Sequence, residues 1–132
     1  MYTIAIQLQF IAQHFLIGGD WGQENEKHSH TYQVEVQLEG TTLDQNGNLV
    51  DTVYLESNLQ ALLSRYRDRT LNELPEFEDA NPSLERFARI LCQSLVSHLH
   101  APNLNAITVK LWEDDFTWGT YRTKIQNKKG SD

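Results

Sequence analysis

Two stretches of regular alternation constrain the fold of this 132-residue chain more than any other feature. From Tyr2 to His14 the even positions are mostly apolar and most odd positions are polar, and a similar alternation runs from His28 to Leu38. Successive side chains of a strand point to opposite faces, so each stretch predicts a strand with one buried face. The polar loop 17–27 joins the two stretches, and we expect the strands to pair in antiparallel fashion.

The remainder of the chain predicts two helices followed by two further strands. Apolar residues recur at helical spacing in two segments, which are separated by a long loop carrying two prolines. Alternation then returns twice before the C-terminus. The expected positions are a helix at 53–66, a helix opening at Ser83, a strand at 107–113 and a strand at 116–125. The order ββααββ favours an α+β fold, with two helices on one face of a four-stranded antiparallel sheet.

Length and charge limit the classes of protein that fit. We expect one domain at 1–125 and a flexible tail at 126–132. The 11 basic and 18 acidic residues give a net charge of −7, and no basic stripe exists to bind nucleic acid. No apolar run approaches the roughly 20 residues that span a bilayer, and the N-terminus does not resemble a signal peptide. The single cysteine, Cys92, suits a reducing compartment, so we expect a cytoplasmic protein without membrane partners.

Three histidines share the expected buried face of the first two strands. His14 has the parity of the apolar positions before it, and His28 and His30 have the parity of those after them. Because antiparallel pairing places these strand ends side by side, the imidazoles should converge. Neutral imidazole nitrogen is a good zinc ligand, and three protein ligands with an open fourth position are typical of a catalytic site. A lone inward histidine is more often a satisfied core residue, so this geometry alone leaves the two interpretations equal.

Five motifs together resemble the 6-pyruvoyl-tetrahydropterin synthase and 6-carboxytetrahydropterin synthase family. They read FIAQH, HSHTY, GNLVD, NPSLERFA and VKLWEDDFTWGTYR, and the match runs from about Ile4 to Arg122. Family motif positions fall on His14, His28, His30, Asp51, Ser83, Glu85, Glu113 and Tyr121. Each motif alone is weak, but five in the same order and spacing are specific.

The resemblance implies a fold, a cofactor and a ligand. It implies the tunnelling fold, in which ββααββ subunits close into an oligomeric barrel, usually a hexamer made of two trimers. It also implies zinc on the three histidines and a pterin pocket between subunits. Glu113 would hold the 2-amino-pyrimidinone edge of the pterin, because a carboxylate can accept two N–H groups at once. Ser83 is expected to contribute to substrate binding.

The chain departs from the family pattern ahead of its histidine pair. Family enzymes carry a catalytic cysteine there, whereas this chain has Glu24 four residues before His28 and no cysteine in the loop. One branch of the family has glutamate at this spacing and converts 7,8-dihydroneopterin triphosphate to 6-hydroxymethyl-dihydropterin. Glu24 is therefore our first candidate for the catalytic base. The alternative is a solvated loop carboxylate.

A second departure lies in the loop after the first helix. The family has an Asp-His pair there, and this chain reads Arg67-Asp68-Arg69. Asp68 becomes the second candidate base, and Arg67 and Arg69 are candidates for contacting a triphosphate. All three could equally be solvated loop residues.

These observations predict a zinc-dependent pterin lyase acting on 7,8-dihydroneopterin triphosphate or a close relative. The alternative is a metal-containing protein that binds pterin or purine-like ligands and has lost catalysis. A structural protein that keeps only the fold is disfavoured, because it has no need of inward imidazoles. The sequence leaves open whether queuosine, folate or biopterin metabolism is served.

Overall fold

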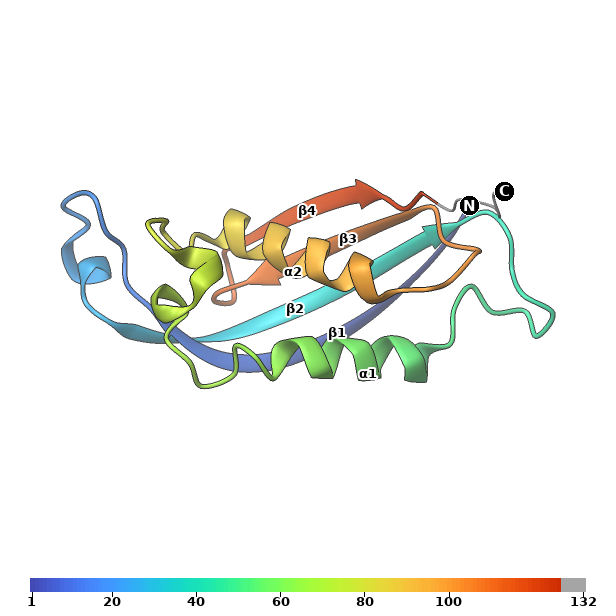
Figure 1. Ribbon diagram of the computed structural model, residues 1–132, viewed down its shortest axis with the longest axis horizontal. Coiled ribbons are helices and arrows are strands. Elements are labelled where there is room, and N and C mark those ends of the chain that lie inside the picture. The colour runs from blue at the N-terminus through green and yellow to red at the C-terminus, as the bar shows by residue number, and fades with distance from the viewer. Residues whose placement is uncertain (127–132) are drawn as a thin grey trace.

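In the computed structural model, which describes residues 1–126, a four-stranded antiparallel sheet is covered on one face by two helices (Figure 1). The strand order is β1-β2-β3-β4, so each strand pairs with its neighbours in sequence. The main elements are β1 (Tyr2–His14), β2 (His28–Gly40), α1 (Thr52–Leu63), α2 (Leu84–His98), β3 (Ala106–Trp112) and β4 (Trp118–Lys124). The predicted fold class is confirmed. The single domain at 1–125 stays a prediction, and the expected tail lies, apart from residue 126, outside the described residues.

The pairing of β1 with β2 brings the histidines together. The two 13-residue strands are in continuous register, with His14 opposite His28 and Ala12 opposite His30. On both strands the even positions face the helices, and burial deepens toward the histidine end of β1. The alternation in the sequence therefore predicted both the strands and the face that carries the three imidazoles.

The first helix ends earlier than predicted. Helix α1 stops at Leu63, and Tyr66 lies in the turns that follow, where its N–H donates to the Leu63 carbonyl at 2.9 Å. Tyr66 is nevertheless buried, because its ring packs against Phe87 at a centroid distance of 5.1 Å. The helical spacing of apolar residues therefore continued past the end of the helix itself.

Strand boundaries moved by a few residues as well. Strand β2 extends to Gly40, two residues beyond the expected end, and β3 stops at Trp112. Strand β4 starts at Trp118 because the Asp114 carboxylate accepts the N–H groups of Phe116 and Thr117, each at 2.8 Å, and holds them in a turn. The predicted loop 67–82 contains two short 3-10 helices, η2 (Leu71–Glu73) and η3 (Pro75–Phe77), and a third, η1 (Gly22–Asn25), lies between β1 and β2.

An aromatic cluster joins the core to the histidine end of the sheet. Phe87 of α2 lies at its centre, with ring centroids 5.1–5.9 Å from four other aromatic rings, those of Phe10, Tyr32, Tyr66 and Phe77. Each such contact adds about 0.5–1.5 kcal/mol beyond the burial of apolar area. The cluster fixes Tyr32, whose hydroxyl reaches toward the imidazoles.

Within residues 1–126, no helix has both the length and the apolar character needed to cross a membrane.

Helix α2 starts at the histidine end of the sheet, where the Ser83 hydroxyl caps it by accepting the Arg86 N–H at 3.2 Å. Helix α1 is capped in the same way by Asp51, which accepts the Val53 N–H at 2.9 Å. Such caps satisfy backbone donors that lack a partner within the helix.

Candidate metal centre and substrate pocket

The three histidines converge at one end of the sheet. Ring centroids lie 4.5 Å apart for His14 and His28, 4.7 Å for His14 and His30, and 4.8 Å for His28 and His30. His14 is only 3% exposed, whereas His28 and His30 are partly exposed. The convergence predicted from strand parity is therefore present in the structure.

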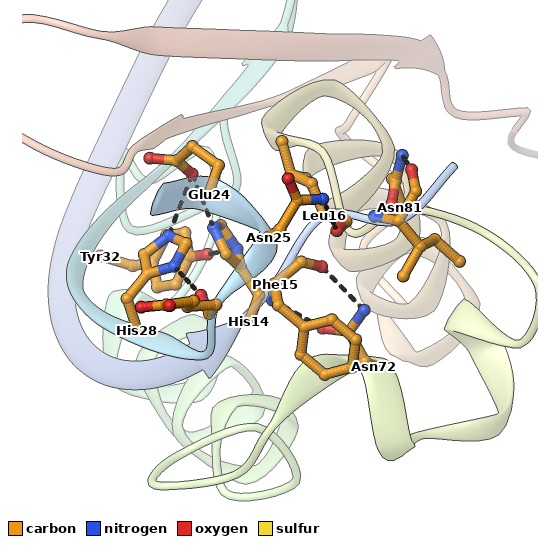
Figure 2. A network of polar contacts seen from close by, with 11 residues as sticks. His14, Phe15, Leu16, Glu24, Asn25, His28, Tyr32, Asn72 and Asn81 are labelled. Carbon is orange, nitrogen blue, oxygen red and sulfur yellow. Dashed lines mark hydrogen bonds and ion pairs between the residues drawn. The ribbon is translucent and has the colours of Figure 1, made fainter. Parts of the chain in front are cut away.

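Hydrogen bonds orient two of these rings. The Tyr32 hydroxyl lies 2.9 Å from Nδ1 of His14, and the Glu26 carbonyl lies 2.7 Å from Nδ1 of His28 (Figure 2). Because a carbonyl only accepts, Nδ1 of His28 is the donor in this contact, and in the neutral ring Nε2 is then the nitrogen with the lone pair. The Nε2 atoms of His28 and His30 are buried and have no hydrogen-bond partner within the described residues. Buried polar atoms of this kind call for a ligand, and a metal ion would supply it.

Burial and mutual repulsion favour the neutral imidazole at His14. Desolvation, together with repulsion from His30 and His28, lowers the pKa of His14 from 6.5 to about 4. A ring with so low a pKa is unprotonated near neutral pH and is ready to bind a cation without first losing a proton.

Glu24 brings a carboxylate to the same point. Its Oε2 atom lies 3.1 Å from Nε2 of His28 and 4.0 Å from Nε2 of His14. One ligand atom from each of Glu24 and the three histidines can be chosen so that all four lie within 4.8 Å of one another. The chemistry of this set, three imidazoles and one carboxylate, suits zinc. The residues present therefore fit the metal that the resemblance implies.

Side-chain amides hold the loop that carries Glu24. Asn72 accepts the N–H of Phe15 at 3.0 Å and donates to its carbonyl at 2.9 Å, so the amide mimics a neighbouring strand. Asn81 makes the same pair of bonds to Ile17, at 2.7 and 3.0 Å. Figure 2 shows these two clamps beside the histidine cluster. They extend the path of β1 past its last residue.

Backbone and side-chain bonds to Leu16, in the segment that follows β1, position Glu24 itself. The Leu16 N–H donates to the Glu24 carbonyl at 2.7 Å, and the Asn25 amide donates to the Leu16 carbonyl at 3.0 Å. Asn25 also accepts the Trp21 N–H at 2.7 Å, which closes the short helix η1 against the loop. The carboxylate is thus presented by an ordered backbone although its side chain is about half exposed.

A cavity of about 320 Å³ opens beside the cluster. It gathers predicted site residues from four parts of the chain, namely His14, Glu24, Ser83 and Glu113. Trp118, Gly119 and Glu85 lie on its wall. Ser83 already accepts a backbone N–H as the cap of α2, and its own hydroxyl proton is available to a ligand.

Glu113 lies just beyond the end of β3 and faces the histidines. Burial raises its pKa, repulsion from Asp114 and Glu24 raises it further, and attraction to His30 and His28 acts in the opposite direction. The carboxylate also borders an open depression of about 480 Å³ on the uncovered face of the sheet. Its position between the two hollows suits a residue that grips the edge of a flat ligand.

Three predicted residues lie elsewhere in the chain. Arg67 and Asp68 line a separate depression of about 320 Å³ along the outer edge of β1, together with Ile11. The Asp68 N–H donates to the Ile11 carbonyl at 2.7 Å, and Asp68 has a positive φ of 60°. The Arg69 carbonyl accepts the Gln13 N–H at 2.9 Å. Within one chain these residues do not join the cavity beside the histidines, and their predicted roles stay predictions.

Sequence reasoning missed the groups that support the site. Tyr32 was expected only as a core residue, although its parity, two positions after His30, places it next to the imidazoles. Asn25, Asn72 and Asn81 were not singled out, and only the position of Asn81 directly before Pro82 in a family motif gave a signal. Their bonds connect residues up to 64 positions apart, which no local pattern reveals.

A model of the family described as 6-pyruvoyl tetrahydropterin synthase matches residues 3–124. The chain belongs to this family. The family resemblance inferred from the five motifs is therefore confirmed, and the match includes every described strand and helix apart from the first residue of β1. A sequence comparison with curated proteins gave no match.

Solved structures of family members share the fold. The 6-pyruvoyl tetrahydropterin synthase of Caenorhabditis elegans has a TM-score of 0.79 at 23% identity, covering 92% of this chain and 95% of that one. The Plasmodium vivax protein has a TM-score of 0.77 at 15% identity, covering 95% of this chain and 100% of that one. A P. vivax variant with cysteine in place of a glutamate, described as a catalytic residue of that protein, has a TM-score of 0.74 at 15% identity with the same coverage.

Proposed function

We propose that the protein is a zinc-dependent lyase that acts on the side chain of 7,8-dihydroneopterin triphosphate or a close relative. One observation carries the proposal. A cluster of three imidazoles and a candidate base adjoins a cavity lined by His14, Glu24 and the candidate pterin anchor Glu113, in a chain of the 6-pyruvoyl tetrahydropterin synthase family. Perturbed titratable groups that meet in a cleft are typical of catalytic sites.

His14, His28 and His30 would hold the metal ion through Nε2. When bound, zinc supplies Lewis-acid stabilisation of negative charge that develops on a substrate oxygen. The chain contributes the orientation of the rings, since Tyr32 and the Glu26 carbonyl each engage an Nδ1 atom. Such supporting bonds fix the ring and its tautomer and raise the basicity of the coordinating nitrogen.

Glu24 is the proposed base. Its carboxylate lies at the mouth of the imidazole cluster, within reach of a proton on a side chain entering the cavity. The description of a glutamate as a catalytic residue in the P. vivax relative supports a glutamate in this role. Glu113 is the proposed anchor, because an ionised carboxylate can accept both a ring N–H and an amino N–H of the pterin.

Asp68, Arg67 and Arg69 take part only if another copy of the chain supplies them. In one chain they lie along the edge of β1, away from the cavity. We propose that a neighbouring subunit brings this loop to the triphosphate side of the pocket. The guanidinium groups of Arg67 and Arg69 would then pair with phosphate oxygens, and Asp68 would be the second acid–base group.

A second candidate function is a metal-containing protein that binds pterins without turnover. The replacement of the family cysteine and of the Asp-His pair favours it. Incubation of the zinc-loaded protein with 7,8-dihydroneopterin triphosphate, with products identified by mass spectrometry, separates the two. Release of a pterin with a shortened or altered side chain supports the lyase. Recovery of intact substrate, together with its tight binding, rejects the lyase and supports the binding protein.

A further inference from the structure

We propose that Glu24 is a fourth protein ligand of the metal ion in the substrate-free protein, so that the resting site is closed by four side chains. The inference deepens the proposed function, since it concerns the same site, and it rests on the three-histidine centre described above. It adds that Glu24 has two positions, one on the metal and one on the substrate. A divalent ion that accepts a tetrahedral set of three nitrogens and one oxygen, such as Zn²⁺, is the ligand that fits.

The distances support coordination. With metal–ligand bonds of about 2.0–2.2 Å, two ligand atoms of a tetrahedral site lie roughly 3.3 Å apart. The Glu24 Oε2 atom is 3.1 Å from Nε2 of His28, close to the spacing expected for two ligand atoms on one ion. With Nδ1 of His28 bonded to the Glu26 carbonyl, Nε2 and the carboxylate oxygen face each other as two ligands of one ion would. All four ligand atoms lie within 4.8 Å of one another, and Glu24 Oε2 is 4.0 Å from Nε2 of His14, so the side chains close by up to about 1.5 Å when they bind the ion.

The orientation of the rings leads to the same arrangement. Nδ1 of His28 and Nδ1 of His14 are both occupied, by the Glu26 carbonyl and the Tyr32 hydroxyl. The free Nε2 atoms are therefore the ones that face Glu24, and Figure 2 shows the carboxylate next to the rings of His14 and His28. Among the described residues that line the cavity there is no lysine or arginine, so a metal ion is the cation that would neutralise the carboxylate there.

The loop is built to hold Glu24 in this position. Its backbone is fixed by the Leu16 N–H at 2.7 Å, and the next residue, Asn25, bonds back to the Leu16 carbonyl. Asn72 and Asn81 then fix the residues on either side of Leu16. Because the backbone is already ordered, only the side chain of Glu24 loses conformational freedom when it binds the metal. The same side chain, about half exposed, can swing away toward the cavity when a substrate enters.

Metal binding in the absence of substrate tests the inference. Zn²⁺ affinity is measured by competition with a chromophoric chelator for the parent protein and for Glu24→Gln. Removing a ligand should weaken binding at least about tenfold, since even the loss of a supporting contact costs 10–100-fold. Glu26→Gln is the matched control, because it removes the same charge from the same loop and keeps the carbonyl that bonds His28. It should change the affinity by no more than about twofold, as expected for an exposed charge. His28→Ala removes a histidine ligand and shows the fall in Zn²⁺ affinity expected when a ligand is lost completely.

Cobalt gives a second readout. In Co²⁺-loaded parent protein the four side chains occupy all positions, so thiocyanate should alter the visible spectrum only at high concentration. In Glu24→Gln the fourth position is open, and thiocyanate should act at a concentration at least about tenfold lower. Circular dichroism of the metal-free variants checks that each is folded. Equal Zn²⁺ affinity and equal thiocyanate response in the parent and in Glu24→Gln would overturn the inference. None of these measurements involves turnover, so they test the coordination separately from the reaction. If the protein leaves 7,8-dihydroneopterin triphosphate intact but shows the four-ligand site, the proposed reaction is rejected and the coordination stands.

Discussion

Tyr32 connects the packing of the protein with its chemistry. Its ring stacks on Phe10 at a centroid distance of 5.2 Å, and its hydroxyl bonds to His14. Burial raises the pKa of Tyr32, and the nearby carboxylates of Glu113 and Glu24 raise it further, so the hydroxyl stays neutral. A rigid neutral hydroxyl can accept the Nδ1 proton of His14 and so orient the ring with Nε2 toward the metal ion.

Replacing Tyr32 by phenylalanine should therefore weaken metal binding without unfolding the core. The ring and its stacking remain, and only the bond to Nδ1 of His14 is lost. We expect a fall in Zn²⁺ affinity of about 10–100-fold, the usual effect of losing a supporting contact. Competition with a chelator measures it, and urea denaturation of the metal-free protein monitors the fold. An unchanged affinity would show that the hydroxyl does not orient His14.

Glu24 and Glu113 should fail in different ways when changed to glutamine. At saturating zinc, Glu24→Gln should bind pterin at least as tightly as the parent and lose turnover by about 10²-fold or more, the scale of a lost general base. Glu113→Gln turns an acceptor into a donor that faces the N–H of the ligand. Pterin binding should then weaken by about 1.5–3 kcal/mol, as for a lost bond to a charged group. Calorimetry and steady-state kinetics separate the two, and normal turnover in Glu24→Gln would transfer the role of base to Asp68.

At the scale of elements, a close approach explains the glycine at the end of β2. A Cβ atom at Gly40 would collide with the Asn103 carbonyl oxygen and with the Leu49 side chain. Gly40→Ala should destabilise the protein by about 1–3 kcal/mol, the usual cost of overpacking. Gly119→Ala is the control, because its Cβ would meet Leu84 at an ordinary 3.6 Å. Chemical denaturation compares the two, and equal midpoints would contradict the prediction.

An ion pair between Arg65 and Glu76, joined by the Tyr66 hydroxyl, stabilises the segment after α1. Arg65 donates two hydrogen bonds to Glu76, at 2.6 and 2.7 Å, and the buried Tyr66 hydroxyl donates a third at 2.7 Å. The bonds from Arg65, together with that from Tyr66, lower the pKa of Glu76 from 4.5 to about 2, although burial opposes them. The network closes the turns that lead to Asp68.

Glu76→Gln should lower stability at neutral pH by about 1–2 kcal/mol, with the value reduced by the partial exposure of Arg65. A carboxylate with a lowered folded-state pKa stabilises the protein fully above its unfolded pKa of 4.5. That stabilisation is lost as the pH falls through the folded value of about 2. The difference between parent and variant should therefore be constant from pH 6 to 8 and shrink below about pH 4.5. Urea denaturation at several pH values tests this, and a difference that grows on acidification would refute it.

At the scale of the whole molecule, the sheet has two outer edges. Within the described residues, β1 and β4 each pair with one strand only. An isolated β-bridge between Gln13 and Thr70 covers a small part of the outer edge of β1. Exposed edges of this length invite pairing with another chain unless an assembly closes them. The predicted barrel would do so and would bring the Arg67–Arg69 loop to a neighbouring pocket.

We therefore expect a trimer or hexamer in solution. Light scattering at micromolar concentration should give three or six times the 15.3 kDa mass of the chain. Gln7→Pro places a residue without an N–H donor in the edge strand β1, and its mass in solution is compared with that of the parent protein. A monomeric parent protein would contradict the barrel and would leave Arg67, Asp68 and Arg69 without a place in the site.

The sequence by itself determined the strands, their inner faces and the meeting of the three histidines. These follow from a period of two and from antiparallel pairing, which act between near neighbours and one partner strand. The resemblance to the family, rather than a local pattern, implied Glu24 and Glu113 as members of the same site. Only the tertiary structure decided the rest. The clamps of Asn72 and Asn81, the early end of α1 and the separation of Asp68 from the cavity depend on contacts between distant segments. Local patterns carry no information on such contacts, because their energies arise only when the whole chain is packed.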